Sequence, residues 1–199
     1  MIISKNKLSI VKQNLRMGEE VLKEFKTEHP YIRSNTMMNI HIERHKNDSR
    51  YTNILPKLSG KSCLAGLKIN EIRYNYERSS RNIEILSKSL KRDKSANCKE
   101  CTTLIFDKLL KRGCKPQNIK LDIVSDAEKA RPRNHTFTVI GLDNKADIAK
   151  PHTWGKDCII IDGWANIVKR AQDGVEYLKQ LFCVDSEQEK CIFKNYSSK

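Results

Sequence analysis

The feature that most constrains the fold is a helix whose two ends are both marked in the sequence. Asn97 is a favoured N-cap residue, and Glu100 follows it three positions later in the capping-box pattern. Gly113 stands where a helix ending near Arg112 needs a residue of positive φ. The pattern predicts a helix that begins at Cys98.

Three segments after this helix have the patterns of β-strands. Residues 119–123 and 136–139 alternate apolar and polar side chains, whereas residues 158–161 form the continuous apolar run of a central strand. Residues 164–182 return to helical spacing, with the pair Asp173–Gly174 as a candidate interruption. Together these segments predict an α+β fold, in which a helix packs on a small, mainly antiparallel sheet.

The first half of the chain has two helical patterns separated by a polar stretch. Residues 8–25 predict a basic amphipathic helix that Pro30 stops, and residues 69–90 predict a second helix. Residues 31–61 are polar and have no clear period, so we expect loops there. The segment 91–96 is predicted to be an exposed connector.

The charge of the chain is concentrated in its first half. The net charge is +14, and residues 1–97 hold 20 Lys and Arg against 10 Asp and Glu. Such a surplus favours anionic partners, which include acidic proteins, phospholipid headgroups and nucleic acid. Aromatic residues are only 7% of the chain and form no stripe interleaved with basic residues, which argues against an obligatory nucleic-acid partner.

The apolar runs and the cysteines bear on the compartment. No apolar run is long enough to span a bilayer, and the first residues lack the apolar core of a secretory signal peptide. The seven Cys residues are odd in number and irregularly spaced, which favours reduced thiols over a disulfide framework. We therefore expect a cytosolic-type soluble protein, with association at a membrane surface left open.

Cys98 is the candidate nucleophile because it occupies the first turn of the predicted helix. The free N–H groups and the partial positive charge of a helix start favour a thiolate, and the same N–H groups can stabilise an oxyanion. Cys101 is the alternative within the same turn. It shares a helix face with Leu104 and Ile105, so we expect it to be a packed core residue instead.

His135 and Asp162 are the candidate base and the candidate orienting carboxylate. His135 opens a predicted strand, whereas the rival His152 lies in a loop flanked by Pro and Gly. Asp162 ends the apolar run at 158–161, where its carboxylate can accept from an imidazole N–H or cap the next helix. Asp157 is a weaker choice because it lies at the opposite end of that strand.

The order of these residues resembles the papain-like and transglutaminase-like superfamily of thiol enzymes. The segments that carry the resemblance are Asn97–Thr102, His135–Gly141, Trp154 and Asp162–Ala165. They are similar to the Asn-Cys-Gly-Glu, His-x-Phe-x-Val-x-Gly and Asp-Pro-Trp motifs of Cys-His-Asp effectors and toxins of bacterial pathogens. Two positions depart from these motifs: Lys99 replaces a Gly, and Gly163 replaces a Pro, which we expect to loosen the turn after Asp162.

The resemblance implies a fold and an activity. It covers about residues 97–168 and implies a papain/transglutaminase-like Cys-His-Asp catalytic core, which we assign to residues 96–199. It leaves residues 1–95 unassigned, and their charge and helical spacing predict a basic, mainly helical region that serves substrate recognition or packing. It implies attack on an amide bond of a host protein through a thioester, by a bacterial effector that acts inside a host cell and needs no cofactor. Peptidases, glutamine deamidases and transglutaminases all fit, because they differ in what resolves the thioester.

Two other interpretations compete with this one. Cys98, Cys101 and Cys114 with a His could form a structural zinc site, although one CxxC without a partner pair is weak evidence. The net charge also fits a non-enzymatic basic module that binds an acidic protein, a membrane surface or nucleic acid.

Overall fold

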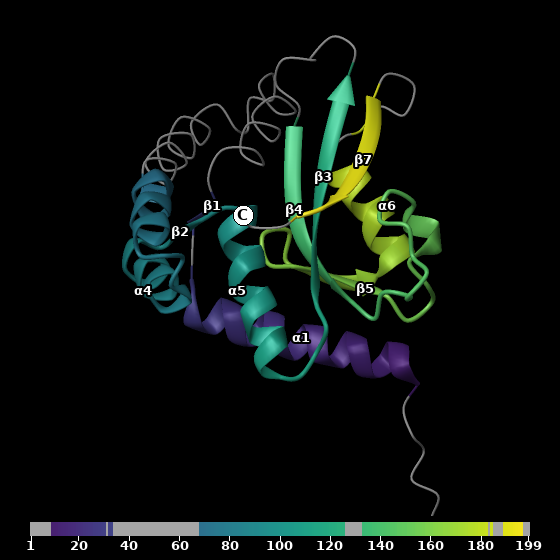
Figure 1. Ribbon diagram of the computed structural model, residues 1–199, viewed down its shortest axis with the longest axis horizontal. Helices are drawn as coiled ribbons and strands as arrows, with labels where there is room; N and C mark the ends of the chain where they lie inside the picture. Colours follow the sequence, from purple (N-terminus) through teal and green to yellow (C-terminus); the bar gives the residue numbers. More distant parts are fainter. Residues whose placement is uncertain are drawn as a thin grey trace, which may run out of the picture.

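The chain forms a five-stranded sheet with helices packed against it (Figure 1). The computed structural model describes residues 9–30, 32–33, 68–125, 133–182, 184 and 189–196. Residues 68–78 are helical. The other elements are α1 (Ile10–Glu28), β1 (Ile32–Arg33), α4 (Ile83–Asp93), β2 (Ser95–Ala96), α5 (Cys98–Lys111), β3 (Gln117–Ser125), β4 (Arg133–Ile140), the 3-10 turn η2 (Pro151–Thr153), β5 (Ile159–Asp162), β6 (Ile167–Arg170), α6 (Ala171–Leu181) and β7 (Glu189–Asn195).

The large sheet has the strand order β6-β5-β4-β3-β7, and all of its pairs are antiparallel. The last pair between β4 and β5 at one end joins Thr138 to Ile161. His135 therefore lies beyond the paired part of these two strands, where β4 pairs only with β3 through Leu121. The predicted α+β class, with a helix on a mainly antiparallel sheet, is confirmed.

Alternate residues of β5 face different helices, which divides the fold into layers. A Cβ on Gly18 of α1 would lie 3.0 Å from side-chain atoms of both Ile159 and Ile161. The residue between them, Ile160, instead meets Gly174 of α6. The helix α5 packs beside α1 and over β4 (Figure 1). The sheet is therefore covered by α1 and α5 on one face and by α6 on the other.

The close approach of α1 to the sheet depends on Gly18. A Cβ at this position would lie 2.8 Å from Cγ1 of Val168, closer than real contacts. We expect Gly18→Leu to lower the free energy of unfolding by about 2 kcal/mol, because an overpacked site must push the helix off the sheet. Chemical denaturation measures this change. Lys12→Leu, on the exposed side of the same helix, is the control. Equal stabilities of the two variants would show that α1 does not pack as described.

The first helix also joins α5 through charged side chains. Lys108 of α5 lies 2.6 Å from a carboxylate oxygen of Glu24 and 3.0 Å from one of Glu28, and Arg112 also pairs with Glu24. Buried residues of α1, α4 and α5 belong to one hydrophobic cluster with the strands. The described part of residues 1–95 thus packs directly onto residues 96–199.

Most elements expected from local patterns are present, with adjusted ends. The helix predicted from Cys98 is α5, and Gly113 follows it with a positive φ of 76°. The three strand patterns correspond to β3, β4 and β5, and the first helical pattern corresponds to α1. Leu8 and most of the predicted loop at 31–61 lie outside the described residues.

Two predictions about the first half are wrong. The helix expected over residues 69–90 is two helices, because Ser80 and Arg81 adopt left-handed conformations and Asn82 then caps α4. The Asn82 side chain accepts from the backbone N–H groups of Glu84 and Ile85. The connector expected at 91–96 is exposed at Lys91, Arg92 and Lys94, but it consists of the end of α4 and the buried strand β2, which pairs in parallel with β1.

The helix predicted over residues 164–182 is also wrong in its first part. Residues 167–170 form β6, which pairs with β5, and only then does α6 begin. Asp173 and Gly174 lie inside α6 and do not interrupt it. Gly174 is needed there because a Cβ would lie 2.8 Å from Cδ1 of Ile160.

Across the part of the chain that the structure describes, no helix is both long and apolar enough to cross a membrane.

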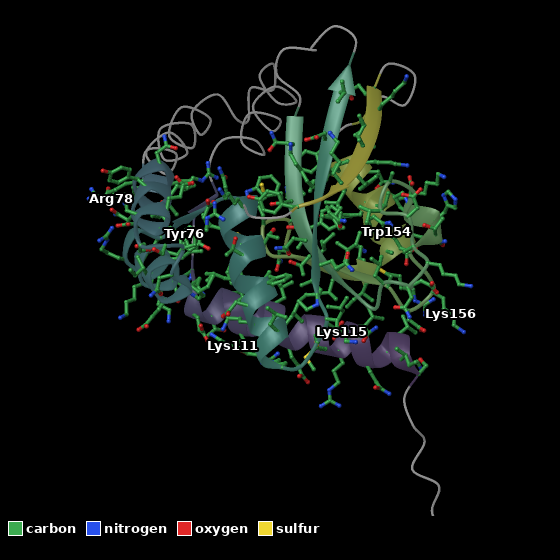
Figure 2. All side chains as sticks on the ribbon, in the orientation of Figure 1. Tyr76, Arg78, Lys111, Lys115, Trp154 and Lys156 are labelled. Atoms are coloured by element: carbon green, nitrogen blue, oxygen red, sulfur yellow. The ribbon has the colours of Figure 1, made fainter. Side chains whose placement is uncertain are left out.

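Basic side chains lie on the outer surface of the fold. Arg78, Lys111 and Lys156 project outward in Figure 2, whereas Trp154 lies inside the fold.

Candidate functional site

Cys98 is the first residue of α5, and the start of this helix is held firmly. Asn97 and Glu100 form a capping box, in which the Glu100 carboxylate accepts from the Asn97 backbone N–H at 3.0 Å. The same carboxylate is buried and also accepts from the Arg73 guanidinium at 2.6 and 3.3 Å. The position of the thiol is therefore set by the helix start and by a side chain from the helix over residues 68–78.

A second set of contacts fixes α5 against β4. The Thr102 hydroxyl donates to the Thr136 carbonyl at 2.9 Å, and both side chains are buried. Thr138 donates back to the Thr102 carbonyl at 3.5 Å. These hydrogen bonds join the first turn and a half of α5 to the strand that carries His135.

His135 is buried, and its ring lies in an aromatic surrounding. The centroid of the imidazole is 5.2 Å from that of Trp164 and 5.0 Å from that of Phe182. Nε2 lies 2.5 Å from Oδ2 of Asp162. Because Nε2 is occupied by this carboxylate, Nδ1 is the ring nitrogen that remains for Cys98, whose side chain is hydrogen-bonded to His135.

Asp162 uses both of its carboxylate oxygens. Oδ2 holds His135, and Oδ1 accepts from the backbone N–H groups of Trp164 at 2.9 Å and Ala165 at 2.8 Å. Two roles were considered for Asp162: orienting the histidine and capping the following segment. One carboxylate makes the contacts that both roles require. The segment that it caps is a turn leading to β6, not a helix.

Gly163 does more than loosen this turn. A Cβ there would lie 2.6 Å from Cδ1 of Ile105 and 3.1 Å from Cβ of Cys101. The turn after Asp162 therefore packs directly under α5, and the missing side chain at 163 allows that contact. The expectation that Gly163 only frees the turn is corrected by this packing.

The three side chains shift one another's protonation. Burial raises the pKa of the Cys98 thiol, but the hydrogen bond and the charge of His135, together with hydrogen bonds to Thr136, outweigh burial and lower the pKa below its ordinary value. Burial likewise lowers the pKa of His135, but Asp162 and then Cys98 outweigh burial and raise it to about 10. These shifts favour a thiolate beside an imidazolium at neutral pH.

The thiol and the imidazole share a pocket. Cys98 and His135 line a pocket of about 250 Å³, and Trp164 and Phe182 form part of its wall. Cys98 is half-buried, so part of the residue remains accessible from the pocket. The arrangement can bring an amide carbonyl to a thiolate that has a proton donor beside it.

The alternative residues lie elsewhere. Cys101 is fully buried, as its helix face predicted. His152 is exposed in η2, and Asp157 lies before β5, at the end opposite Asp162. Trp154, which contributes to the motif resemblance, is buried in the core, with its ring centroid 5.6 Å from that of Phe193.

The proposed zinc ligands do not come together. Cys98 begins α5 and Cys114 follows its end, so about 20 Å of helix lies between them. Within the described residues, no group of three or more His, Cys, Asp or Glu is placed to hold a metal ion. Cys98, Cys101 and Cys114 therefore cannot share one metal ion.

The residues near the thiol that the sequence analysis missed include Arg73, Thr136, Phe182 and Tyr196. Thr136 is hydrogen-bonded to Cys98, and Phe182 stacks on Trp164 with an interplanar angle of 4°. Thr136 follows His135 directly, so its position was within reach of a sequence argument. The other three come from distant elements, and no local pattern connects them with Cys98.

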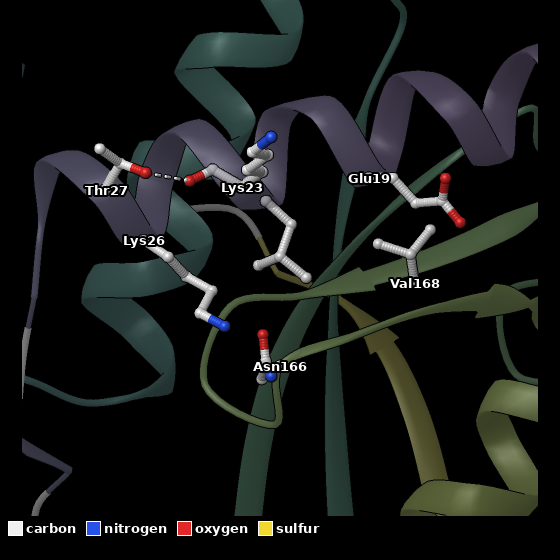
Figure 3. A pocket seen from close by; sticks show the side chains of 7 residues that line it. Glu19, Lys23, Lys26, Thr27, Asn166 and Val168 are labelled. Atoms are coloured by element: carbon white, nitrogen blue, oxygen red, sulfur yellow. Dashed lines mark hydrogen bonds between the residues drawn. The ribbon is translucent and has the colours of Figure 1, made fainter.

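A second hollow lies away from Cys98. A groove of about 480 Å³ lies between α1 and the turn before β6. Figure 3 shows Lys23, Lys26 and Asn166 among the residues that line it. Its lining contains no thiol and no histidine. The pocket beside Cys98, which has both a thiol and a histidine, is therefore the stronger candidate for a reactive site.

Comparison of the chain with protein-family models, with curated proteins and with solved structures finds no match.

Proposed function

We propose that this chain is a cysteine-dependent enzyme that attacks an amide bond of a protein substrate through a thioester intermediate. One observation carries the proposal: Cys98, His135 and Asp162 form a continuous hydrogen-bonded series at a pocket. Cys98 acts as nucleophile, His135 as acid and base, and Asp162 as the residue that orients His135.

The first step is attack of the Cys98 thiolate on the amide carbonyl carbon. The carbon–sulfur bond forms as the carbonyl π electrons move to oxygen, and N–H groups at the start of α5 stabilise the oxyanion. The imidazolium of His135 then gives its proton to the amide nitrogen as the carbon–nitrogen bond breaks. The amine leaves, and the acyl group remains on Cys98 as a thioester.

The second step determines the type of enzyme. Neutral His135 takes a proton from the incoming nucleophile, which attacks the thioester and releases the thiolate. Water gives hydrolysis, either of a peptide bond or of a glutamine side chain, and an amine gives a crosslink. The resemblance to papain-like and transglutaminase-like effectors supports all three outcomes, and it supports action on a host protein after transfer from a bacterium.

The test is the rate at which each thiol reacts with limiting iodoacetamide near pH 6, followed by mass spectrometry of the peptides. We expect Cys98 to be alkylated faster than the other cysteines, because it is the thiol held as a thiolate by an imidazolium. His135→Gln should slow Cys98 by about tenfold, since thiolate is lost while each remaining thiolate is more nucleophilic.

The matched control is His29→Gln. His29 is as buried as His135, but it bonds to Ser87 and to the Phe25 carbonyl, away from the pocket. The His29→Gln variant should leave the rate of Cys98 alkylation unchanged. If all cysteines reacted slowly, according to exposure alone, the enzyme proposal would fail and a basic binding module would be the better interpretation.

A further inference from the structure

The wall of the pocket beside Cys98 is cationic. Three basic residues, Arg73, Lys99 and Lys120, line it, and no Asp or Glu is among its described lining residues. The three come from separate elements: the helix over residues 68–78, the first turn of α5, and β3. A charge surplus spread over the surface does not by itself produce such a convergence on one pocket.

Glu100 holds the Arg73 guanidinium in one orientation, and this contact uses only some of the guanidinium N–H groups. The buried carboxylate of Glu100 accepts from Nε at 2.6 Å and from one terminal nitrogen at 3.3 Å. These bonds use two of the five N–H groups of a guanidinium, and the others donate to no described residue. The side chain is 35% exposed, so these donors are available to a ligand in the pocket.

Each of the two lysines forms an ion pair with a carboxylate that does not line the pocket. Lys120 Nζ lies 2.8 Å from Oδ1 of Asp122, and Lys99 Nζ lies 3.9 Å from Oε1 of Glu77. Both lysine side chains are 35% exposed. Each cation therefore has a carboxylate partner but still presents part of its side chain to solvent.

Arg73 is also within electrostatic reach of the reacting thiol. Burial lowers the pKa of the Arg73 guanidinium, whereas Glu100 and then Cys98 raise it. Because Arg73 and Cys98 line the same pocket, a group bound by Arg73 would lie in the pocket where Cys98 attacks its carbonyl.

We propose that Arg73, supported by Lys99 and Lys120, binds a carboxylate of the substrate, so that the attacked amide lies beside an acidic side chain of a protein. A guanidinium fork matches a carboxylate in two parallel hydrogen bonds, which gives direction as well as charge. This inference rests on the proposed function, because it names the substrate class of the same site.

Two alkylating reagents of nearly equal size test the subsite. Iodoacetate carries a carboxylate and iodoacetamide does not, and both alkylate Cys98 by displacement of iodide from the same carbon. The readout is the ratio of the two Cys98 rates in the full chain, mapped by mass spectrometry. Changes in the amount or the nucleophilicity of thiolate affect both reagents and cancel in the ratio.

Arg73→Gln should lower the iodoacetate-to-iodoacetamide ratio by about fivefold, the size of a partly solvated ion pair. Arg73→Lys should recover part of the ratio, and Lys120→Gln should lower it less than Arg73→Gln. Arg78→Gln is the control, because this arginine lies on the same helix but stacks on Tyr74 at the outer surface (Figure 2). Added salt should reduce the wild-type ratio.

Two peptides of equal length distinguish a side-chain carboxylate from a chain-end carboxylate. The measurement is how strongly each peptide protects Cys98 from alkylation. One has an internal Glu and an amidated C-terminus, and the other has Gln there and a free C-terminal carboxylate. Stronger protection by the Glu peptide, lost in Arg73→Gln, supports the proposal. Equal or stronger protection by the Gln peptide would overturn it in favour of a chain-end carboxylate.

The two proposals fail in different ways. If Cys98 reacts rapidly with iodoacetamide but neither Arg73→Gln nor Lys120→Gln changes the ratio, the subsite is wrong and the enzyme proposal stands. If Cys98 reacts with both reagents no faster than the other cysteines, the enzyme proposal fails, and the subsite fails with it.

Discussion

Asp162→Ala is expected to lower the free energy of unfolding by about 4 kcal/mol, and Asp162→Asn by about half as much. Both changes leave the imidazolium of His135 without its carboxylate. The amide oxygen of Asn can still accept from the N–H groups of Trp164 and Ala165, whereas Ala leaves both without this acceptor. Denaturant unfolding near neutral pH measures the difference between the two variants.

Both variants should also slow alkylation of Cys98 near pH 6, by about tenfold. Loss of Asp162 lowers the pKa of His135, so less imidazolium remains to hold the thiolate. Asp157→Asn, at the other end of β5, is the control and should change neither measurement strongly. Equal stability of Asp162→Asn and Asp162→Ala would refute the turn-capping role. Unchanged labelling in both would refute the orienting role.

The parts of the fold that were predictable are those whose signals are local. The helix α5 has a capping box at one end and a glycine of positive φ at the other, and both are formed. The strands β3, β4 and β5 have the alternating or continuous apolar patterns that a sheet of this kind requires. Cys98 begins α5, Asp162 ends β5 and His135 lies two residues inside the start of β4, which is why their proximity could be anticipated.

The parts that were missed depend on tertiary contacts. The left-handed residues Ser80 and Arg81 divide a helical pattern without any Gly or Pro to mark the break. The four residues of β6 also fit a helical spacing, and only pairing with β5 makes them a strand. A pattern shorter than about two helical turns does not distinguish the two structures.

The position of Arg73 at the candidate site also depends on tertiary contacts and could not be predicted from local sequence. Nothing around this residue in the sequence relates it to Cys98, and Glu100, which holds it, was assigned only a capping role. The two residues meet because the helix over residues 68–78 brings Arg73 to the start of α5. A buried carboxylate with two partners is a property of packing and not of a local motif.

The pH dependence of alkylation is expected to separate Cys98 from Cys114 most strongly. The pKa of Cys98 is lowered, so its thiolate persists as the pH falls below the ordinary range of a thiol. The pKa of His135 is raised to about 10, so the imidazolium persists as the pH rises to that value. Between these limits the ion pair is intact, so the Cys98 rate should fall much less steeply below pH 9 than the rate of an ordinary thiol.

Cys114 is the internal reference, because burial raises its pKa by more than the charge of Arg112 lowers it. Its rate should fall by about tenfold for each pH unit below its pKa, since only the thiolate reacts. Comparing slopes and not absolute rates removes the difference in exposure between the two thiols. His135→Gln should give Cys98 the steep slope of Cys114. Parallel profiles in the wild-type chain would mean that Cys98 is an ordinary thiol, and no part of the proposed chemistry would survive that result.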